Sequence, residues 1–245
     1  MWGAENFNAA PTAGTAMATI IRFEEQIEIP LGLRTLAEFR AWATSDAFPE
    51  QGRIDYLSGS IEVDMSPEDL HTHGKLKTEL VGALWRRIKQ DQLGELYSDR
   101  TRVSCPAADL SAEPDVVFVS ENSLDTGRVR LVRKPGGGAD RYVELEGPPD
   151  LVVEIVSDAS VRKDTERLPA SYYRAGVTEY WLVDARGEDL FFRIHRRGPA
   201  QYDPVEVDAE GYQPSAVLDR RYRLDRSRNK RGRVVFDLNE KTMSK

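Results

Sequence analysis

One carboxylate lies inside an apolar run in the stretch Pro149–Ser157, whose sequence is PDLVVEIVS. Residues 151–156 are mostly β-branched, and such a run predicts a strand that is covered on both faces of its sheet. An ionised glutamate is costly in such a strand unless a cation, a proton or a metal ion compensates its charge. The stretch therefore predicts a buried central strand and singles out Glu154.

A second run upstream repeats this design. Its sequence is PDVVFV over residues 114–119, with Asp115 at the mouth of the expected strand. Acidic residues on neighbouring strands can converge on one point, and two carboxylates are the minimum for a hard divalent cation. The competing interpretation is structural: backbone donors or an arginine, for instance Arg102 or Arg130, would satisfy Glu154.

Composition limits the class of protein. The chain has 245 residues, of which 40% are hydrophobic, and this predicts one sizeable core with tails. No apolar run approaches the roughly 18–20 residues of a membrane span, and the N-terminus lacks the pattern of a secretory signal. A single cysteine, Cys105, suits a reducing cytoplasm, and with three histidines it disfavours a structural zinc site.

The net charge of −7 disfavours a protein that coats nucleic acid non-specifically, but the charge is uneven. Residues 219–245 carry ten Lys and Arg against four Asp and Glu, which leaves −13 on the remainder. A solvated surface is the default explanation of such a segment, and a phosphate-facing arm is the alternative. We expect a disordered lead-in at residues 1–20, a main domain at 21–200, and a C-terminal extension at 201–245 packed on it.

Two helices are predicted in the first third of the chain. A capping box, Thr35-Leu36-Ala37-Glu38, starts the first, and a strand–turn–strand segment follows at residues 53–65. Ser66-Pro67 supplies an N-cap and a first-turn proline for the second helix. The buried stripe of that helix is Leu76, Leu80, Ala83, Leu84 and Ile88, with His73 and Lys77 beside it.

The later segments are mainly strands, expected around 96–104, 114–119, 128–133, 151–156 and 179–184, with further strands near 191–195, 220–224 and 234–236. A helix between the fourth and fifth of these ends at Gly176, which stands where a helix C′ glycine belongs. The order predicts an α+β or α/β domain, with a mixed β-sheet flanked by helices and extra C-terminal strands.

The acidic pair suits metal-assisted phosphodiester hydrolysis, which needs carboxylates for Mg²⁺, a cation for the developing charge, and water as nucleophile. Asp115 and Glu154 are the candidate metal ligands, with the Ile155 carbonyl as a further one. Lys163 is the nearest lysine after Glu154, in a polar connection that can fold back over the strand end.

These motifs resemble the PD-(D/E)XK nuclease superfamily and, more closely, the Uma-two group of restriction endonucleases. The resemblance runs from about Gly52 to Arg186 and rests on ordered blocks. They are Gly59, Val63-Asp64-Met65-Ser66-Pro67, His73, Pro114-Asp115, Pro149–Ser157, Ser160-Val161-Arg162-Lys163-Asp164-Thr165, Ala175-Gly176-Val177 and Glu179–Arg186. The resemblance implies a restriction-endonuclease-like mixed sheet and cleavage of nucleic acid, with DNA as the expected substrate. It also implies Mg²⁺ as cofactor, with Mn²⁺ as a substitute.

By position, the resemblance assigns metal binding to Asp115 and Glu154. Many members carry a lysine four residues beyond an Asp that matches Asp164, whereas this chain has Leu168 there. Only Lys163 remains for the lysine role, with Arg167 as its substitute. Pro169 also departs from a regular helix, although a helix that starts near residue 165 or later tolerates it in its first turn.

Several further residues carry two interpretations each. His73, Lys77, Glu79 and Arg167 are candidate auxiliary site residues, and each is otherwise a structural or solvated side chain. The sequence thus predicts a Mg²⁺-dependent endonuclease without a membrane segment; a homodimer would let two sites cut two strands. The alternative is a non-catalytic domain of the same fold that binds nucleic acid or a protein partner.

Overall fold

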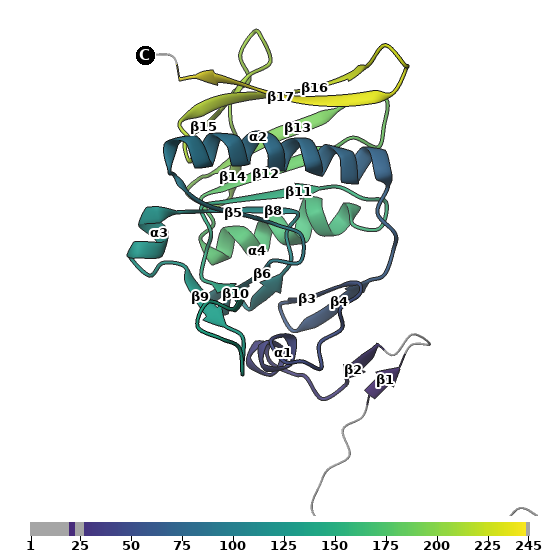
Figure 1. Ribbon diagram of the computed structural model, residues 1–245, viewed down its shortest axis with the longest axis vertical. Coiled ribbons are helices and arrows are strands. Elements are labelled where there is room, and N and C mark those ends of the chain that lie inside the picture. Colours follow the sequence, from purple (N-terminus) through teal and green to yellow (C-terminus); the bar gives the residue numbers. More distant parts are fainter. Residues whose placement is uncertain (1–19, 23–26, 244–245) are drawn as a thin grey trace, which may run out of the picture. The chain divides into compact units, whose positions relative to one another are not determined.

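The structure is a computed structural model that describes residues 20–22 and 27–243. The chain divides into two compact units, Met1–Leu33 and Arg34–Lys245 (Figure 1). In the first unit, β1 (Ile20–Arg22) pairs antiparallel with β2 (Glu28–Pro30). The predicted lead-in lies, apart from residue 20, outside the described residues. Everything below concerns the second unit.

The central sheet of this unit has six strands in the order β14-β13-β12-β11-β8-β5. The strand predicted from the apolar stretch is β11, which runs parallel to β12 and antiparallel to β8, so the sheet is mixed as expected. The bounds are β5 (Gly94–Ser98), β8 (Val116–Ser120), β11 (Leu151–Ile155), β12 (Glu179–Asp184), β13 (Phe191–Arg197) and β14 (Tyr202–Pro204).

A second six-stranded sheet has the order β4-β3-β7-β6-β10-β9. Its strands are β3 (Arg53–Leu57), β4 (Ser60–Asp64), β6 (Arg102–Cys105), β7 (Leu110–Ala112), β9 (Arg130–Arg133) and β10 (Tyr142–Glu146). The single strand predicted around 96–104 is wrong, because β5 and β6 belong to different sheets. Asp99 and Arg100, between them, both have positive φ (40° and 53°), and this turn carries the chain from one sheet to the other.

The smallest sheet is formed by β15 (Gln213–Ser215), β16 (Arg220–Arg228) and β17 (Val234–Thr242). Helix α1 (Leu36–Ala43) starts at the predicted capping box, which is confirmed by the reciprocal bonds between Thr35 and Glu38. The other helical segments are η1 (Leu70–Lys75), α2 (Leu76–Asp91), η2 (Pro106–Ala108), α3 (Glu121–Asp125), η3 (Lys163–Arg167) and α4 (Leu168–Ala175).

The predicted start of the second helix at Ser66 is wrong. The helical turn η1 begins at Leu70, and Asp69 is its N-cap. The Asp69 carboxylate accepts hydrogen bonds from the backbone N–H groups of His71 and Thr72, at 2.8 and 2.6 Å. Ser66 instead donates its hydroxyl to Asp64, so its side chain is used in the preceding loop. Asp69 is the N-cap in place of Ser66 because its carboxylate accepts hydrogen bonds from two free N–H groups of the first turn.

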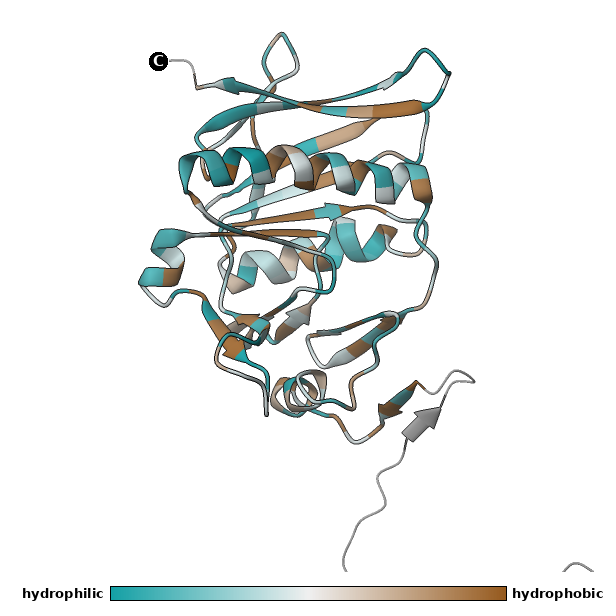
Figure 2. Ribbon diagram, in the orientation of Figure 1, coloured by the Kyte–Doolittle hydropathy of each residue, from teal (hydrophilic) through white to brown (hydrophobic). Residues whose placement is uncertain are grey.

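Two apolar cores cover opposite faces of the central sheet. Helix α2 and the β16–β17 hairpin pack on one face, where Leu80, Trp181 and Phe236 share one cluster. Helix α4 and the second six-stranded sheet pack on the other, where Tyr172 and Tyr180 lie. Figure 2 shows hydrophobic residues concentrated on the central strands, while α2 alternates along its length. Each large apolar side chain buried here contributes about 1.5–3 kcal/mol relative to exposure.

Pro169 is the second residue of α4, but α4 continues the π-helical turn η3 without a break, and helical structure begins at residue 161. The expected helix start near residue 165 or later is therefore wrong, and the proline follows a π-helical turn instead of starting the helix. Gly176 ends α4 in the left-handed conformation. Tyr180 and Trp181 are buried core residues. Among the described residues, no helix is long and apolar enough to cross a membrane.

Candidate functional site

The two predicted acidic residues lie at the same end of two neighbouring strands. Strands β11 and β8 pair as far as Val153 opposite Val116; Glu154 follows Val153 in β11, and Asp115 directly precedes β8, so both lie at this end of the strand pair. The backbone N–H of Ile155 donates to Asp115 Oδ2 at 2.7 Å, which fixes the Asp115 carboxylate beside the end of β11.

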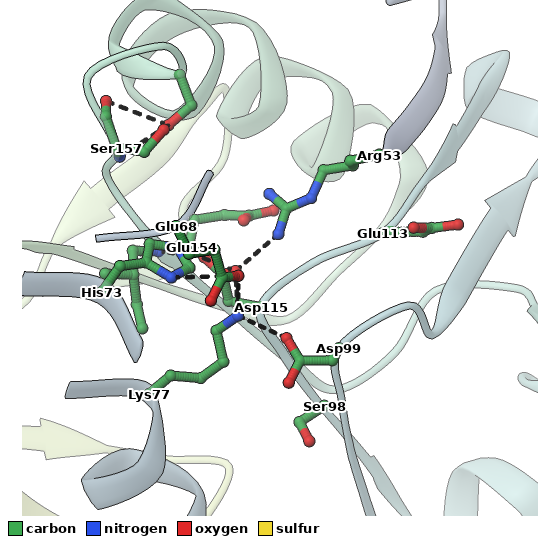
Figure 3. A network of polar contacts seen from close by, with 12 residues as sticks. Arg53, Glu68, His73, Lys77, Ser98, Asp99, Glu113, Asp115, Glu154 and Ser157 are labelled. Atoms are coloured by element: carbon green, nitrogen blue, oxygen red, sulfur yellow. Dashed lines mark hydrogen bonds and ion pairs between the residues drawn. The ribbon is translucent and has the colours of Figure 1, made fainter. Parts of the chain in front are cut away.

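Asp115 is fully buried and surrounded by cations (Figure 3). Its Oδ1 accepts a hydrogen bond from Arg53 at 2.8 Å. His73 Nε2 and Lys77 Nζ lie 3.3 and 3.5 Å from the same oxygen. Burial alone would raise the pKa of Asp115, but the hydrogen bond from His73 and the charge of Arg53 hold it well below its usual range. Asp115 is therefore ionised at neutral pH.

Glu154 has the opposite electrostatic character. Its side chain is 1% exposed; Oε1 accepts a hydrogen bond from the Tyr172 hydroxyl at 2.8 Å, and Oε2 has no hydrogen-bond partner in the described part of the chain. Burial, followed by the charges of Asp164 and Asp115, raises the pKa of Glu154 well above its usual value. A buried carboxylate oxygen without a donor is the kind of group that a cation satisfies.

Asp164 lies near this pair and shares its environment. Its carboxylate accepts a hydrogen bond from the Ser160 hydroxyl, and its other oxygen has no partner. Burial, partly offset by that hydrogen bond, raises the pKa of Asp164 to about 7. Two neighbouring buried carboxylates with raised pKa values indicate that protons and cations compete for this region.

Lys163 is buried and forms an ion pair with Asp55 on β3. The other oxygen of Asp55 accepts the backbone N–H of Glu113 at 2.9 Å. Burial would lower the pKa of Lys163, but the charge of Asp55 overcomes this and raises it. The Lys163 charge also acts on Glu154, although its hydrogen bond goes to Asp55.

A cleft of about 410 Å³ opens beside Asp115. It is lined by residues from several separate segments of the chain, among them Arg53, Asp64, Glu68, His73, Arg100 and Ser157. Because Arg53 and His73 both contact Asp115, the cleft gives access to the Asp115 side of the site. Lys163 does not line it.

The residues present fit a divalent cation. Glu68, His73 and Asp115 each offer a ligand atom, and these atoms lie within 4.8 Å of one another. His73 is buried, and its Nδ1 lies 3.4 Å from Glu68 Oε1 without hydrogen-bond geometry. Glu154 adds the unpartnered oxygen described above. A set of carboxylate oxygens suits Mg²⁺ or Mn²⁺, and an imidazole favours the latter.

The other candidate residues lie elsewhere or have other partners. Glu79 accepts the backbone N–H of Leu238 at 3.0 Å, so it joins α2 to β17 and does not meet the acidic pair. Arg167 pairs with Glu62. Leu168, in the position where a lysine was expected by resemblance, is buried in the core.

The structural alternative named two arginines as partners of Glu154, and that part of it is wrong. Arg102 pairs with Glu113, and Arg130 pairs with Glu146. Ser157 bonds the connector through the Ser160 hydroxyl, at 2.9 Å from both its backbone nitrogen and its hydroxyl. Among the described residues, no side chain that could act as a base contacts Ser157, as a nucleophilic serine would require.

Sequence reasoning missed four contributors: Arg53, Asp55, Glu68 and Tyr172. These residues lie on other segments than β8 and β11, and no local sequence pattern connects them with Asp115 or Glu154. One signal was available for two of them: Arg53 and Asp55 alternate on a predicted strand, so their side chains share one face of it.

The mixed central sheet, with two acidic residues at the ends of its central strands, is typical of a restriction-endonuclease-like fold. A family model described as Uma2, putative restriction endonuclease, matches residues 36–225. The chain belongs to the Uma2 family, and the resemblance seen in the sequence is confirmed.

A solved structure supports the fold. It is described as a putative nuclease belonging to DUF820 from Anabaena variabilis ATCC 29413. The superposition has a TM-score of 0.55 at 19% identity, and it covers 75% of this chain and 90% of that one. A search among curated proteins found no match.

Proposed function

We propose that this protein is a metal-dependent endonuclease that hydrolyses phosphodiester bonds in nucleic acid, with DNA as the expected substrate. The observation that carries the proposal is the pair of buried carboxylates at the ends of β8 and β11, one of which, Glu154, has an oxygen without a partner among the described residues. Membership of a family described by nuclease activity supports the reaction class.

Asp115 and Glu154 would hold Mg²⁺, or Mn²⁺ in its place, with the Ile155 carbonyl as a further ligand. A bound divalent cation supplies charge neutralisation and an activated water. The chain supplies the rest. Tyr172 orients Glu154 through its hydroxyl, and the Ile155 N–H orients Asp115, so neither carboxylate has to reorganise far to bind.

Lys163 would assist water attack. Its ammonium is held by Asp55, which keeps it charged and fixes its position near Glu154. His73 and Lys77 would adjust the charge around Asp115, while Glu79 and Arg167 have no contact with the acidic pair in support of a site role.

A basic hairpin supports nucleic acid as the substrate. Residues 226–236, at the tip of β16–β17, carry five Lys and Arg and no acid. Four of these, Arg228, Lys230, Arg231 and Arg233, are exposed. The hairpin contacts η1, the segment that carries His73, because Lys75 of η1 donates to the Val234 carbonyl. The phosphate-facing arm considered from the sequence is therefore part of this proposal.

The test is cleavage of plasmid DNA and of RNA by the purified protein with Mg²⁺ or Mn²⁺. Asp115→Asn and Glu154→Gln are expected to lower the cleavage rate on the order of a thousandfold. The matched controls Asp125→Asn and Glu95→Gln change exposed carboxylates and should cleave as the wild type does. Equal cleavage by Glu154→Gln and the wild type would overturn the proposal.

A non-catalytic binding domain of the same fold is the second candidate. The buried Leu168, in place of the lysine expected by resemblance, favours it. A wild type that binds metal and nucleic acid but cuts neither DNA nor RNA would establish this candidate. A homodimer with two sites, and a cytoplasmic location, remain expectations.

A further inference from the structure

Asp115 Oδ1 already has cationic neighbours on three sides. Arg53 donates to it at 2.8 Å, and His73 and Lys77 lie 3.3 and 3.5 Å away. The second oxygen accepts the Ile155 N–H. A carboxylate has about four lone-pair positions, so a metal ion can reach this one only if a neighbour moves away.

The three neighbours differ in what they would lose by leaving. Lys77 also contacts Glu68 at 2.6 Å and Asp99 at 2.5 Å. His73 also lies beside Glu68, at 3.4 Å. Arg53 hydrogen-bonds Asp115 alone among the described residues. Of the three neighbours, Arg53 therefore has the fewest polar contacts with residues other than Asp115.

Arg53 also occupies the position that a shared metal ion needs. Its charge acts on both Asp115 and Glu154. Figure 3 shows its guanidinium directed at Asp115, with the hydrogen bond between them. The side chain is 22% exposed and lines the cleft, so it has solvent-accessible space to move into.

We propose that Arg53 occupies the place of the metal ion in the metal-free protein, and that it turns into the cleft to bind the substrate phosphate once a metal ion takes over Asp115. This rests on the proposed function and deepens it. A guanidinium binds a phosphate with two parallel hydrogen bonds, a geometry that the compact ammonium of a lysine lacks. No covalent step is assigned to Arg53.

The proposal also accounts for the absent helix lysine. Leu168 brings no charge, and Lys163 is buried against Asp55 and does not line the cleft. Arg53 and His73 both contact Asp115 and line the cleft where a phosphate would enter, and of these two Arg53 carries the guanidinium. It would therefore be a catalytic residue, because it would touch the substrate.

The test is metal affinity and cleavage measured on the same variants. Titration calorimetry with Mn²⁺ alone should give Arg53→Gln a metal dissociation constant about tenfold lower than that of the wild type, because a competing charge is gone. Its cleavage should fall on the order of a hundredfold, because a cation at the phosphate is lost. Tighter metal binding with slower cleavage is a combination that a merely structural arginine would not produce.

Arg100→Gln is the matched control, since Arg100 is exposed and lines the same cleft but makes no contact with Asp115 among the described residues. Its metal affinity should stay within about twofold of the wild type. Arg53→Lys keeps the charge that competes with the metal, so its metal affinity should stay near the wild-type value. It should still cleave about tenfold more slowly, because two-point phosphate binding is lost.

Two outcomes would overturn the inference, and they are distinguishable. If Arg53→Gln and the wild type bind Mn²⁺ equally well, Arg53 does not occupy the metal's place, while the proposed function stands. If neither protein binds Mn²⁺, the proposed function fails and the inference fails with it. If Arg53→Gln does not fold, wild-type cleavage by Arg53→Lys would by itself reject the phosphate role.

Discussion

At the scale of single residues, Glu154 is a buried carboxyl group whose surroundings oppose its ionisation. Burial and the charges of Asp164 and Asp115 raise its pKa. A raised carboxylate pKa contributes stability that is present below the unfolded pKa, about 4.3, and lost as pH rises through the folded value. The ionised form therefore opposes folding at neutral pH, and protonation relieves this.

Glu154→Gln removes that cost while its amide oxygen can still accept the Tyr172 hydroxyl. We expect the metal-free variant to be more stable than the wild type at pH 8 by about 1–3 kcal/mol, with the difference shrinking toward pH 4. Urea unfolding from pH 4 to 8 measures this. A variant that is much less stable at pH 8 would show that Glu154 is held by a structural ion pair.

Unlike ionised Glu154, the Lys163–Asp55 pair favours the folded state, because each buried charge is compensated by the other. Lys163→Ala leaves the Asp55 carboxylate buried without its cation, which should cost about 3–5 kcal/mol in the free energy of unfolding. If Lys163 assists water attack, cleavage should also fall on the order of a hundredfold while metal affinity changes little.

The double variant Lys163→Met, Asp55→Asn separates the two effects. It should recover most of the lost stability, since no buried charge is left unpaired, yet remain slow in cleavage. Recovery of both stability and cleavage would mean that Lys163 serves the fold alone. Chemical unfolding and plasmid cleavage on the same preparations decide between these results.

At the scale of elements, the β16–β17 hairpin is the part that a nucleic-acid backbone would meet. Its tip is fixed by its own bonds: the Asn229 side chain accepts the backbone N–H of Arg231 at 2.9 Å and that of Arg233 at 3.1 Å. The exposed cations are therefore presented on an ordered turn. Ordered cations lose less conformational entropy when they contact phosphates.

Replacing both Lys230 and Arg231 by Gln should weaken DNA binding, with a salt dependence that shows the cause. Each phosphate contact contributes about 0.9 to the slope of log K against log salt, so the slope should fall by about 1.8. The control changes Arg86 and Lys89, two exposed cations on α2, to Gln. An equal fall in slope for both pairs would show that the hairpin contributes to DNA binding only as general surface charge.

At the scale of the whole molecule, metal binding should stabilise the fold, because the site is assembled from segments that lie apart in the chain. β3, η1, β8, β11 and α4 all contribute a contact to the acidic pair. An ion that binds the folded chain alone adds about 2.7 kcal/mol at one hundred times its dissociation constant. Melting temperature should rise by about 5–10 °C with saturating Mn²⁺.

Glu154→Gln should lose this rise, and Glu95→Gln, which changes an exposed glutamate on the edge strand β5, should keep it. Melts followed by circular dichroism with and without Mn²⁺ provide the measurement. A rise that persists undiminished in Glu154→Gln would place the ion elsewhere, with Glu68, His73 and Asp115 as the first set to test.

The sequence by itself determined the elements whose signal is local. The β-branched run gave β11, the reciprocal pair Thr35 and Glu38 gave the start of α1, and Gly176 gave the end of α4. It also identified Asp115 and Glu154, because a charge inside an apolar strand stands out without any knowledge of its neighbours.

Only the tertiary structure decided what surrounds those charges. Arg53 and Tyr172 reach the acidic pair from β3 and α4. Lys163 forms an ion pair with Asp55 and does not line the cleft. The choice of Asp69 over Ser66 as N-cap was also decided in space, by competition for the same backbone donors. Periodicity reports which face a residue occupies, whereas the partner on that face depends on how distant strands and helices pack.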